Sequence, residues 1–524
     1  MMDYLIKDAS IIYGAGVPAL KGDIAVSQGI IDQVGQLRDM QAKVTIDAQG
    51  KTVTPGFIDM HSHSDVLFAN GQTIEHKLLQ GVTTELIGQD GISAAPLTES
   101  SKRTMADIIE PLAGSLKGEW VPWNMDQFLS TISAQKTQLN VMTLTGHCNL
   151  RMAVMGSKMA EAAPEDVQKM QALLAETMEQ GSFGLSLGLI YPPSSYSNTA
   201  ELISLGEVVR QYDGIIVSHM RNEQEGIMDA LDEMIGIGEK SGARIHISHL
   251  KCLGKNNWGK MPLVLERLEQ AEKKGVAISF DQYPYDASST TLSLLLPPWA
   301  LEGGWSGFSE HLEDFKSRQK ILQGIKQSMT GRGGPDSIKI ATAQDPGCDE
   351  IVGKSLAEAA EIWEVSPEEA AYKILCASKL GAMAIYHAMS TADVECAMTH
   401  HLHTVGSDGV LGAFPHPRAY GTFPRVLGHF RKDRSLFSLE SGIRDMTSKP
   451  AQVMRLAKRG LIEPGYFADI LIFDPDLFTD NATYDQPANL ASGLDWVFIN
   501  GEPVVEQGRI ESRFPGQVLR PGRP

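Results

Sequence analysis

Short apolar runs recur through the middle of the chain, and each tends to be followed by a stretch compatible with a helix. Eight such runs lie between residues 56 and 408. Alternating strands and helices are what a parallel barrel requires, and eight strands are the number that closes one. We therefore predict an α/β fold, a (β/α)8 barrel, with strands at 56–63, 83–90, 139–147, 181–188, 214–219, 243–249, 275–281 and 402–408.

The two ends of the chain follow another pattern. Residues 1–54 form short β-rich pieces separated by Gly and Asp turn signals, and the tail repeats this style in "YFADILIFDPD" and "LDWVFINGEPVVEQGRI". Two β-rich ends around a long middle predict one small β-sandwich built by both termini. The expected domains are residues 1–54 and 461–524 for the sandwich and 55–460 for the barrel.

Two intervals between predicted strands, about 91–138 and 282–401, are too long for plain crossovers. The second interval is rich in Pro, Gly and Trp. That composition is typical of an insertion that covers a site. We therefore predict a lid-like insertion around residues 287–400.

Composition narrows the class of protein. The 524 residues, 42% hydrophobic and 21% charged, suit a globular protein with a large core and a smaller second domain. A net charge of −18 without a basic stripe argues against nucleic acid and anionic membrane as partners. The first residues lack the basic lead and apolar core of a signal peptide, and the five cysteines contain no CxxC. We therefore expect a cytoplasmic protein without disulfides.

Histidines and aspartates stand at the ends of the predicted strands. In "GFIDMHSHSD" the first strand ends in His61 and His63, and strand alternation places both imidazoles on one side. His219, His249 and Asp408 close three further strands. Such a pair of histidines would more often be structural, but five such residues on strand ends are unlike a chance arrangement. Imidazole and carboxylate are the ligands of hydrolytic zinc, and barrel chemistry sits at the C-terminal ends of the strands.

Five further motifs occur in one order: "GLIYPPSSY", "SHMRNE", "ISHLKCLG", "FDQYPYDASST" and "HPRAYGTFPRVL". With the strand-end residues, they make the chain resemble the N-acyl-D-amino-acid deacylases (D-aminoacylases) of the amidohydrolase superfamily over nearly its whole length. The resemblance implies a metal-dependent hydrolase with one or two Zn²⁺ per chain and a small-molecule substrate. It would cleave the amide bond of N-acyl-D-amino acids into a carboxylate and a free D-amino acid, with Asp408 as general base and acid. An alternative role for Asp408 is to orient a histidine.

The resemblance also implies a ligand set. His219 and His249 would hold the tightly bound zinc, and the third ligand of the family is a cysteine in "GNCG". Here the motif is "GQDG", so Asp90 stands in its place. A carboxylate is a harder ligand than a thiolate, which can change metal preference and stoichiometry. Asp90 could bridge two metals, with His61 and His63 completing the second site, or it could be a turn residue beside a weak site.

The α-carboxylate of such a substrate needs a cation. The candidates are Arg418, by its fork geometry, and Lys251, which follows a metal ligand closely. The resemblance places Tyr191, Tyr283 and Ser289 in the substrate pocket, where they could bond the carboxylate or polarise the carbonyl. The alternatives are surface charges, packed aromatic side chains and turn residues.

Two other functions compete with this one. Cyclic amidases of the hydantoinase or dihydroorotase type, and the isoaspartyl dipeptidase, bridge two metals with a carboxylated lysine at the end of strand four. Residues 181–188, "GSFGLSLG", contain no lysine. An inactive barrel scaffold would be expected to lose its ligands, which this chain retains. Cys148 in "TGHCNLR" is expected to be a core thiol and not a substitute ligand.

Overall fold

The computed structural model describes residues 1–343 and 345–522. Its centre is a barrel of eight parallel strand positions, the third of which is broken at Leu144 into two pieces. The barrel strands are β6 (Phe57–Asp59), β7 (Val82–Ile87), β8 (Asn140–Thr143) with β9 (Thr145–Gly146), β10 (Gly184–Gly188), β11 (Ile215–His219), β12 (Arg244–Ile247), β13 (Ile278–Gln282) and β17 (His403–Val405).

Backbone hydrogen bonds close the barrel between its first and last strands. The Met60 amide donates to the Val405 carbonyl at 3.3 Å, and the Asp408 amide donates to the His61 carbonyl at 2.9 Å. The predicted (β/α)8 fold is therefore confirmed. The closure also brings the residues that follow β6 beside those that follow β17.

Helices cover the outer face of the barrel, so strands such as β7, β10 and β11 are buried at every residue. Helix α8 shows why the chain folds this way: its apolar residues recur at helical spacing, and Gly242, whose φ is 71°, caps its C-terminal end. The covering helices are α6 (Pro164–Glu179), α7 (Thr199–Gln211), α8 (Ile227–Ser241), α9 (Met261–Lys273) and α14 (Thr391–Met398). The remaining helices outside the insertion are α1 (Asp65–Ala69), α2 (Glu75–Leu78), α3 (Lys102–Ala113), α4 (Met125–Gln135), α5 (His147–Met155), α15 (Arg418–Arg425), a π-helical turn (Val426–Asp433), α16 (Leu439–Met446), α17 (Ser448–Val453) and two 3₁₀ turns (Ser194–Tyr196 and Lys255–Asn257).

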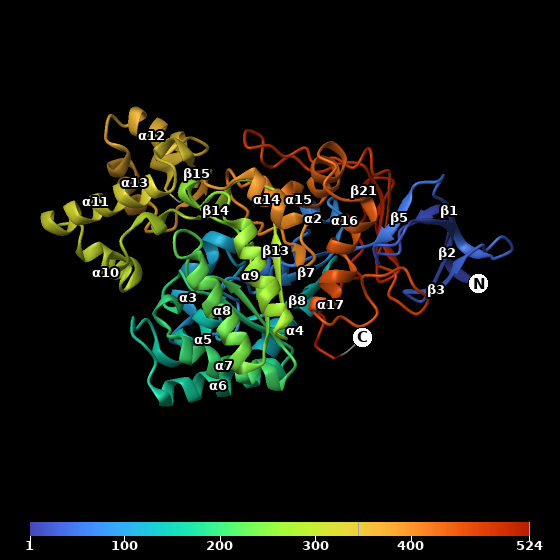
Figure 1. Ribbon diagram of the computed structural model, residues 1–524, viewed down its shortest axis with the longest axis horizontal. Coiled ribbons are helices and arrows are strands. Elements are labelled where there is room, and N and C mark those ends of the chain that lie inside the picture. Colours follow the sequence, from blue (N-terminus) through green and yellow to red (C-terminus); the bar gives the residue numbers. More distant parts are fainter. Residues whose placement is uncertain (344, 523–524) are drawn as a thin grey trace.

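Strands from both termini share one nine-stranded sheet, which Figure 1 shows at one end of the molecule. Strand β5 pairs antiparallel with β18 and so joins the two ends of the chain. The strands are β1 (Met2–Ile11), β2 (Leu20–Ser27), β3 (Ile30–Gly35), β4 (Ala42–Asp47), β5 (Thr52–Pro55), β18 (Ile470–Phe473), β19 (Leu494–Ile499), β20 (Glu502–Glu506) and β21 (Arg509–Ile510). Beyond this sheet the chain returns to the barrel, where the Val141 amide donates to the Gln517 carbonyl at 2.9 Å. The boundaries at residues 54 and 461 stay a prediction.

The long interval after β13 contains a small α/β unit at the other end of the molecule (Figure 1). Its antiparallel sheet has the order β14-β16-β15, and its helices enclose a hydrophobic core of their own that includes Phe308, Ile325 and Ile374. We call this unit, residues 287–388, the insertion. Its elements are β14 (Ser288–Thr291), α10 (Gly304–Glu310), α11 (Phe315–Gly331), β15 (Ile338–Thr342), α12 (Leu356–Ile362), α13 (Pro367–Ala377) and β16 (Met383–Tyr386). Helix α14, which follows it, packs against α9 on the barrel.

Within residues 1–343 and 345–522, no helix combines the length and the apolar character that a membrane span needs.

Candidate metal centre

The C-terminal rim of the barrel gathers the predicted histidines and aspartates. Each follows or ends a different strand, apart from the pair after β6, and none is more than 7% exposed. Because parallel barrel strands end at one rim, residues far apart in sequence meet there. The residues are His61 and His63 after β6, Asp90 after β7, His219 at the end of β11, His249 after β12 and Asp408 after β17.

Asp90, His219 and His249 form one group. The Nδ1 atom of His219 lies 3.0 Å from the Nε2 atom of His249. The Oδ1 atom of Asp90 lies 3.6 Å from His249 Nε2 and 3.9 Å from His219 Nδ1. One atom from each residue is therefore close enough to share a metal ion.

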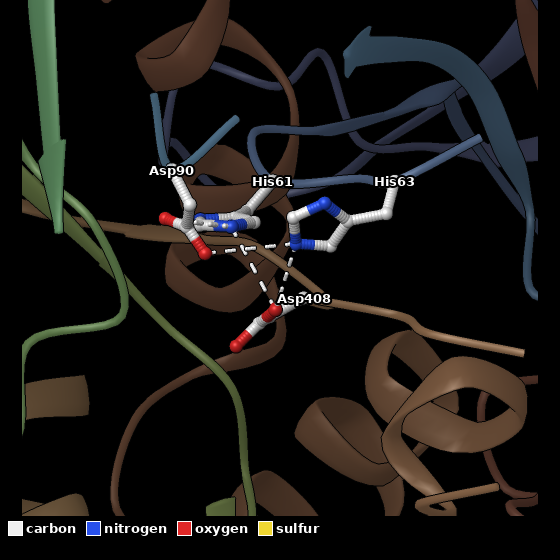
Figure 2. A group of neighbouring side chains, drawn as sticks. All are labelled: His61, His63, Asp90 and Asp408. Carbon is white, nitrogen blue, oxygen red and sulfur yellow. Dashed lines mark ion pairs between the residues drawn. The ribbon is translucent and has the colours of Figure 1, made fainter. Parts of the chain in front are cut away.

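Asp90 also belongs to a second group, with His61, His63 and Asp408 (Figure 2). Its Oδ1 lies 3.6 Å from His61 Nε2, and its Oδ2 lies 3.7 Å from His63 Nε2. The Oδ1 atom of Asp408 lies 3.3 Å from His63 Nε2 and 3.7 Å from His61 Nε2. Asp90 thus stands between two possible metal positions.

The chemistry of these donors fits zinc. Among the described residues, the buried atoms His61 Nε2 and Asp90 Oδ1 have no hydrogen-bond partner. An unpaired buried polar atom is costly, and a cation would satisfy both. Burial, the largest influence, lowers the pKa of His219 to about 4, so the imidazole is neutral at pH 7, the form that binds metal. Nitrogen and oxygen donors in this number can hold one or two zinc ions.

Three of these residues have strained backbones. Asp90, His249 and Asp408 have φ values of 55°, 34° and 48°, in the left-handed region that side-chain-bearing residues rarely adopt. Each such residue costs on the order of 1–3 kcal/mol and is held only where its surroundings fix it. Strain of this kind gathers at functional sites, so it marks the rim independently of the side chains.

Arg418 contacts Asp408. Its Nη1 lies 2.9 Å from Asp408 Oδ2, its Nη2 donates to the Ser289 carbonyl at 3.0 Å, and its guanidinium lies 4.5 Å from the centre of the Tyr283 ring. Burial opposes ionisation of Asp408, but the charge of Arg418 and then that of His61 outweigh it and hold the pKa of Asp408 below its usual range. Asp408 is therefore an ionised carboxylate that can accept a proton.

A cavity of about 710 Å³ reaches from the rim to the insertion. Asp90, His219, His249 and Asp408 line its barrel end. The candidates Tyr191, Lys251 and Ser289 also line it, whereas Arg418 and Tyr283 lie outside the lining. The cavity therefore offers one continuous space for a small molecule, bounded by the rim and the insertion. The Tyr191 hydroxyl lies 2.9 Å from Thr290 Oγ1, which connects the loop after β10 to β14 of the insertion.

Comparison with known proteins agrees with this geometry. The sequence profile described as "Amidohydrolase family" matches residues 44–278 and 363–505. An N-acyl-D-glutamate deacylase from Alcaligenes xylosoxydans xylosoxydans is 33% identical over 99% of this chain and 96% of its own length, and a D-aminoacylase from the same organism is 33% identical over 99% and 97%. The crystal structure of N-acyl-D-glutamate deacylase from Bordetella bronchiseptica, complexed with zinc and a phosphonate mimic of the tetrahedral intermediate, superposes with a TM-score of 0.85. It is 34% identical and covers 99% of each chain.

This chain belongs to the D-aminoacylase branch of the amidohydrolase family. Between the two stretches that match the family profile lie residues 279–362, which contain β14, α10, α11, β15 and α12 of the insertion.

The end of strand four in this amidohydrolase has no room for a bridging lysine. Strand β10 reads "GLSLG", and a side chain at Gly188 would collide with the Asp90 carbonyl oxygen. The bridging lysine that a cyclic amidase would need is therefore absent from β10. The backbone of β10 instead packs directly against Asp90.

Glu223 is a buried residue of the site that the sequence analysis missed. Its Oε1 lies 3.3 Å from His249 Nδ1 and accepts from Lys251 Nζ at 2.7 Å, and its Oε2 lies 3.5 Å from His219 Nε2. Burial opposes ionisation, but His219 and then Lys251 lower the pKa of Glu223 to about 2. A carboxylate on the outer nitrogen fixes the tautomer of a ligand histidine. Its place four residues after His219, in "SHMRNE", was the available signal.

A buried ionic network below the rim was also missed. Lys77 Nζ lies 2.5 Å from Asp59 Oδ2 and 2.9 Å from Glu85 Oε1, and it donates to Ser407 Oγ at 2.7 Å. Asp59 Oδ1 accepts from the amides of His61 at 3.1 Å and Ser407 at 2.8 Å. The network therefore holds the ends of β6 and β17 together, directly beneath the residues that they carry.

Asp281, at the C-terminal end of β13, serves the other side of the rim. Its Oδ1 accepts from the His249 amide at 2.9 Å, and its Oδ2 lies 3.0 Å from His246 Nε2 and 3.7 Å from His61 Nδ1. It thereby fixes the backbone of one candidate ligand and faces the ring of another.

His147 shares the strand-end signal but lies outside the metal centre. It begins α5, and its ring nitrogens lie 2.9 Å from Ser194 Oγ and 2.8 Å from Glu201 Oε1 in a fully buried cluster. Cys148 beside it is buried in the hydrophobic core, as expected, and the five cysteines are unpaired.

A third cluster of possible ligands, Glu269, His400 and His401, lies at the opposite end of the barrel, before β17 begins. The Leu402 amide donates to His400 Nδ1 at 3.3 Å, so the proton of a neutral ring is on Nε2, which lies 3.2 Å from Glu269 Oε1. This contact is a hydrogen bond that uses the nitrogen a metal would need.

Proposed function

We propose that this protein is a zinc-dependent N-acyl-D-amino-acid deacylase, which hydrolyses the amide bond to give a carboxylate and a free D-amino acid. The observation that carries the proposal is Asp90, whose two oxygens face both histidine pairs beside the ionised Asp408, at the end of an open cavity. The relatives that match the full chain are named for this activity. From composition alone we also keep the expectation of a cytoplasmic protein without nucleic-acid or membrane partners.

Asp90, His219 and His249 would hold the principal zinc, and His61 and His63 would complete a second position with Asp90. When bound, zinc supplies Lewis acidity that polarises a carbonyl and lowers the pKa of water. Asp90 Oδ1 lies near His61 and His249, and Asp90 Oδ2 lies near His63. This placement supports a bridging role for Asp90.

Asp408 would move the proton. It would take a proton from the water whose oxygen attacks the amide carbonyl carbon. It would then give that proton to the nitrogen as the C–N bond breaks, so that a neutral amine leaves. General acid–base catalysis of this kind contributes about 10²–10⁴-fold in rate. In the structure Arg418 pairs with Asp408, which keeps the carboxylate ionised but also makes it a weaker base.

The substrate carboxylate would be held at the cavity wall. Lys251, Tyr191 and Ser289 line the cavity and offer an ammonium and two hydroxyl groups. Lys251 already contacts Glu223, so its charge would be shared between that carboxylate and the substrate. Arg418 and Tyr283 lie behind Asp408. For these two, we propose a contact with the substrate carboxylate only after Asp408 moves away from Arg418.

The test is hydrolysis of matched enantiomers. Purified, zinc-reconstituted protein is assayed with N-acetyl-D- and N-acetyl-L-leucine, methionine, asparagine and glutamate, and the release of free amino acid is measured. We expect turnover of the D-forms with strong discrimination against the L-forms, because fixed carbonyl and carboxylate positions leave one place for the side chain. Equal turnover of both hands, or turnover of hydantoin or dihydroorotate in place of these substrates, would refute the proposal.

A further inference from the structure

Three arginine and lysine side chains line the cavity: Arg221, Lys251 and Arg332. Arg221 lies 2.9 Å from Glu233, and Lys251 lies 2.7 Å from Glu223, so two of the charges are paired with carboxylates. Within residues 1–343 and 345–522, no carboxylate forms an ion pair with the third, Arg332. In a protein of net charge −18, an unpaired arginine in a binding cavity calls for an explanation.

Arg332 is half-buried at the C-terminal end of α11, on the wall that the insertion contributes. Its Nη1 donates to Ser328 Oγ at 2.7 Å, with the Ser328 carbonyl 3.4 Å away. Its guanidinium lies 5.7 Å from the centre of the Tyr386 ring on β16, a buried aromatic side chain that also lines the cavity. These contacts fix the plane of the guanidinium and leave most of its N–H groups without an acceptor among the described residues.

We infer that Arg332 binds a second carboxylate of the substrate, one other than the α-carboxylate. This inference rests on the proposed function and names a substrate class within it. The rim fixes the scissile amide at one end of the cavity, and Arg332 presents a planar fork of donors elsewhere along the same cavity. That fork matches a carboxylate in a bidentate pair, and partial burial strengthens the pair.

The second carboxylate can come from two parts of the substrate. It is either the side chain of an acidic D-amino acid or the far end of a dicarboxylic acyl group. Both present the same anion to Arg332, and substrates that carry the charge on one arm only distinguish them.

Arg318 on the same helix provides a matched control. It too lies over a tyrosine ring, 5.4 Å from the centre of Tyr372, but it is paired with Glu369 and does not line the cavity. A cation near a helix C-terminus also interacts favourably with the helix dipole. Arg332 could be retained for that reason alone, and the experiment therefore measures stability beside specificity.

The experiment compares kcat/KM for two pairs of acid and isosteric amide. N-acetyl-D-glutamate is paired with N-acetyl-D-glutamine, and N-succinyl-D-alanine is paired with N-succinamoyl-D-alanine. Wild type, Arg332→Met and Arg318→Met are assayed, with N-acetyl-D-leucine as the neutral reference and thermal unfolding as the measure of stability. We expect wild type to prefer the acid in one pair by at least about tenfold, and that pair identifies the arm. Arg332→Met should remove most of this preference and leave N-acetyl-D-leucine turnover within about twofold, and Arg318→Met should keep the preference.

Three outcomes overturn the inference. Wild type could hydrolyse neutral N-acyl-D-amino acids without preferring either acid, which removes the second carboxylate and keeps the proposed function. Arg332→Met could keep the acid preference while only its unfolding temperature falls, which makes Arg332 a helix cap. Finally, no N-acyl-D-amino acid of any charge could be hydrolysed, which removes the proposed function together with the inference.

Discussion

The barrel rim and the insertion wall face each other across one cavity, and they are built differently. The rim consists of buried residues at the ends of parallel strands. Three of them have strained backbones, and carboxylates beneath the rim help to fix its residues in place. The insertion wall comes from a separate antiparallel sheet with its own core, most of it outside the stretch that matches the family profile. The barrel thus carries the candidate metal centre, whereas we propose that the insertion, a unit with a core of its own, selects the substrate.

The largest effect is expected from removing a metal ligand at the rim. His249→Ala should lose bound zinc and lower kcat by at least about 10³-fold, because two protein donors no longer make an adequate site. His400→Ala is the matched control, since His400 lies at the other end of the barrel, and it should keep zinc and activity. Metal content and turnover are measured on both. Full zinc content in His249→Ala would remove His249 from the ligand set.

A change at Asp408 separates catalysis from metal binding. Asp408→Asn should lower kcat by on the order of 10²-fold or more while zinc stays bound. It should also destabilise the fold, because Arg418 is fully buried and loses its counter-ion. The double variant Asp408→Asn with Arg418→Met should recover stability in a thermal melt but not kcat. Near-normal turnover of Asp408→Asn would contradict its role.

The network beneath the rim predicts a smaller effect. Lys77→Met should lower kcat by about tenfold, since groups that orient metal ligands typically contribute 10- to 100-fold. Arg459→Met is the control: it breaks the buried pair with Asp469 in the terminal sheet, and it should lower the unfolding temperature without changing kcat per bound zinc. Equal kcat in the two variants would make Lys77 purely structural.

The smallest expected effect concerns the contact between rim and insertion. Tyr191→Phe removes the hydrogen bond to Thr290, whose net value of about 0.5–1.5 kcal/mol corresponds to roughly a two- to tenfold change. We expect this in KM, with kcat retained, because the hydroxyl positions the cavity wall and is proposed to hold the substrate carboxylate, and it does not belong to the metal centre. Steady-state kinetics with one D-substrate decides it. A large fall in kcat with unchanged KM would place Tyr191 in the chemical step.

The rim could be predicted from the sequence because polar residues interrupt apolar strands where a barrel must open. His61, Asp90, His219 and Asp408 carried that signal and lie together. His147 carried the same signal and lies elsewhere, because the strand breaks at Leu144 and the ring belongs to a helix.

The features that the sequence did not predict depend on long-range contacts. Lys77 donates a hydrogen bond to Ser407, 330 residues later in the chain, and no local sequence pattern predicts such a partner. The insertion was expected as a lid-like stretch, but its fold depends on pairings such as Ser289 with Ile385, which join segments nearly one hundred residues apart. Periodicity is a local property and does not specify such pairings.

Zinc titration of the metal-free protein tests the central claim most directly. Bound zinc and hydrolysis of an N-acetyl-D-amino acid are measured on the same samples, for wild type and for Asp90→Ala. We predict that activity is absent without metal, rises with bound zinc in wild type, and is lost with most of the bound zinc in Asp90→Ala, because Asp90 belongs to both groups of ligands. Turnover by the metal-free protein, or full zinc content and turnover in Asp90→Ala, would contradict the account.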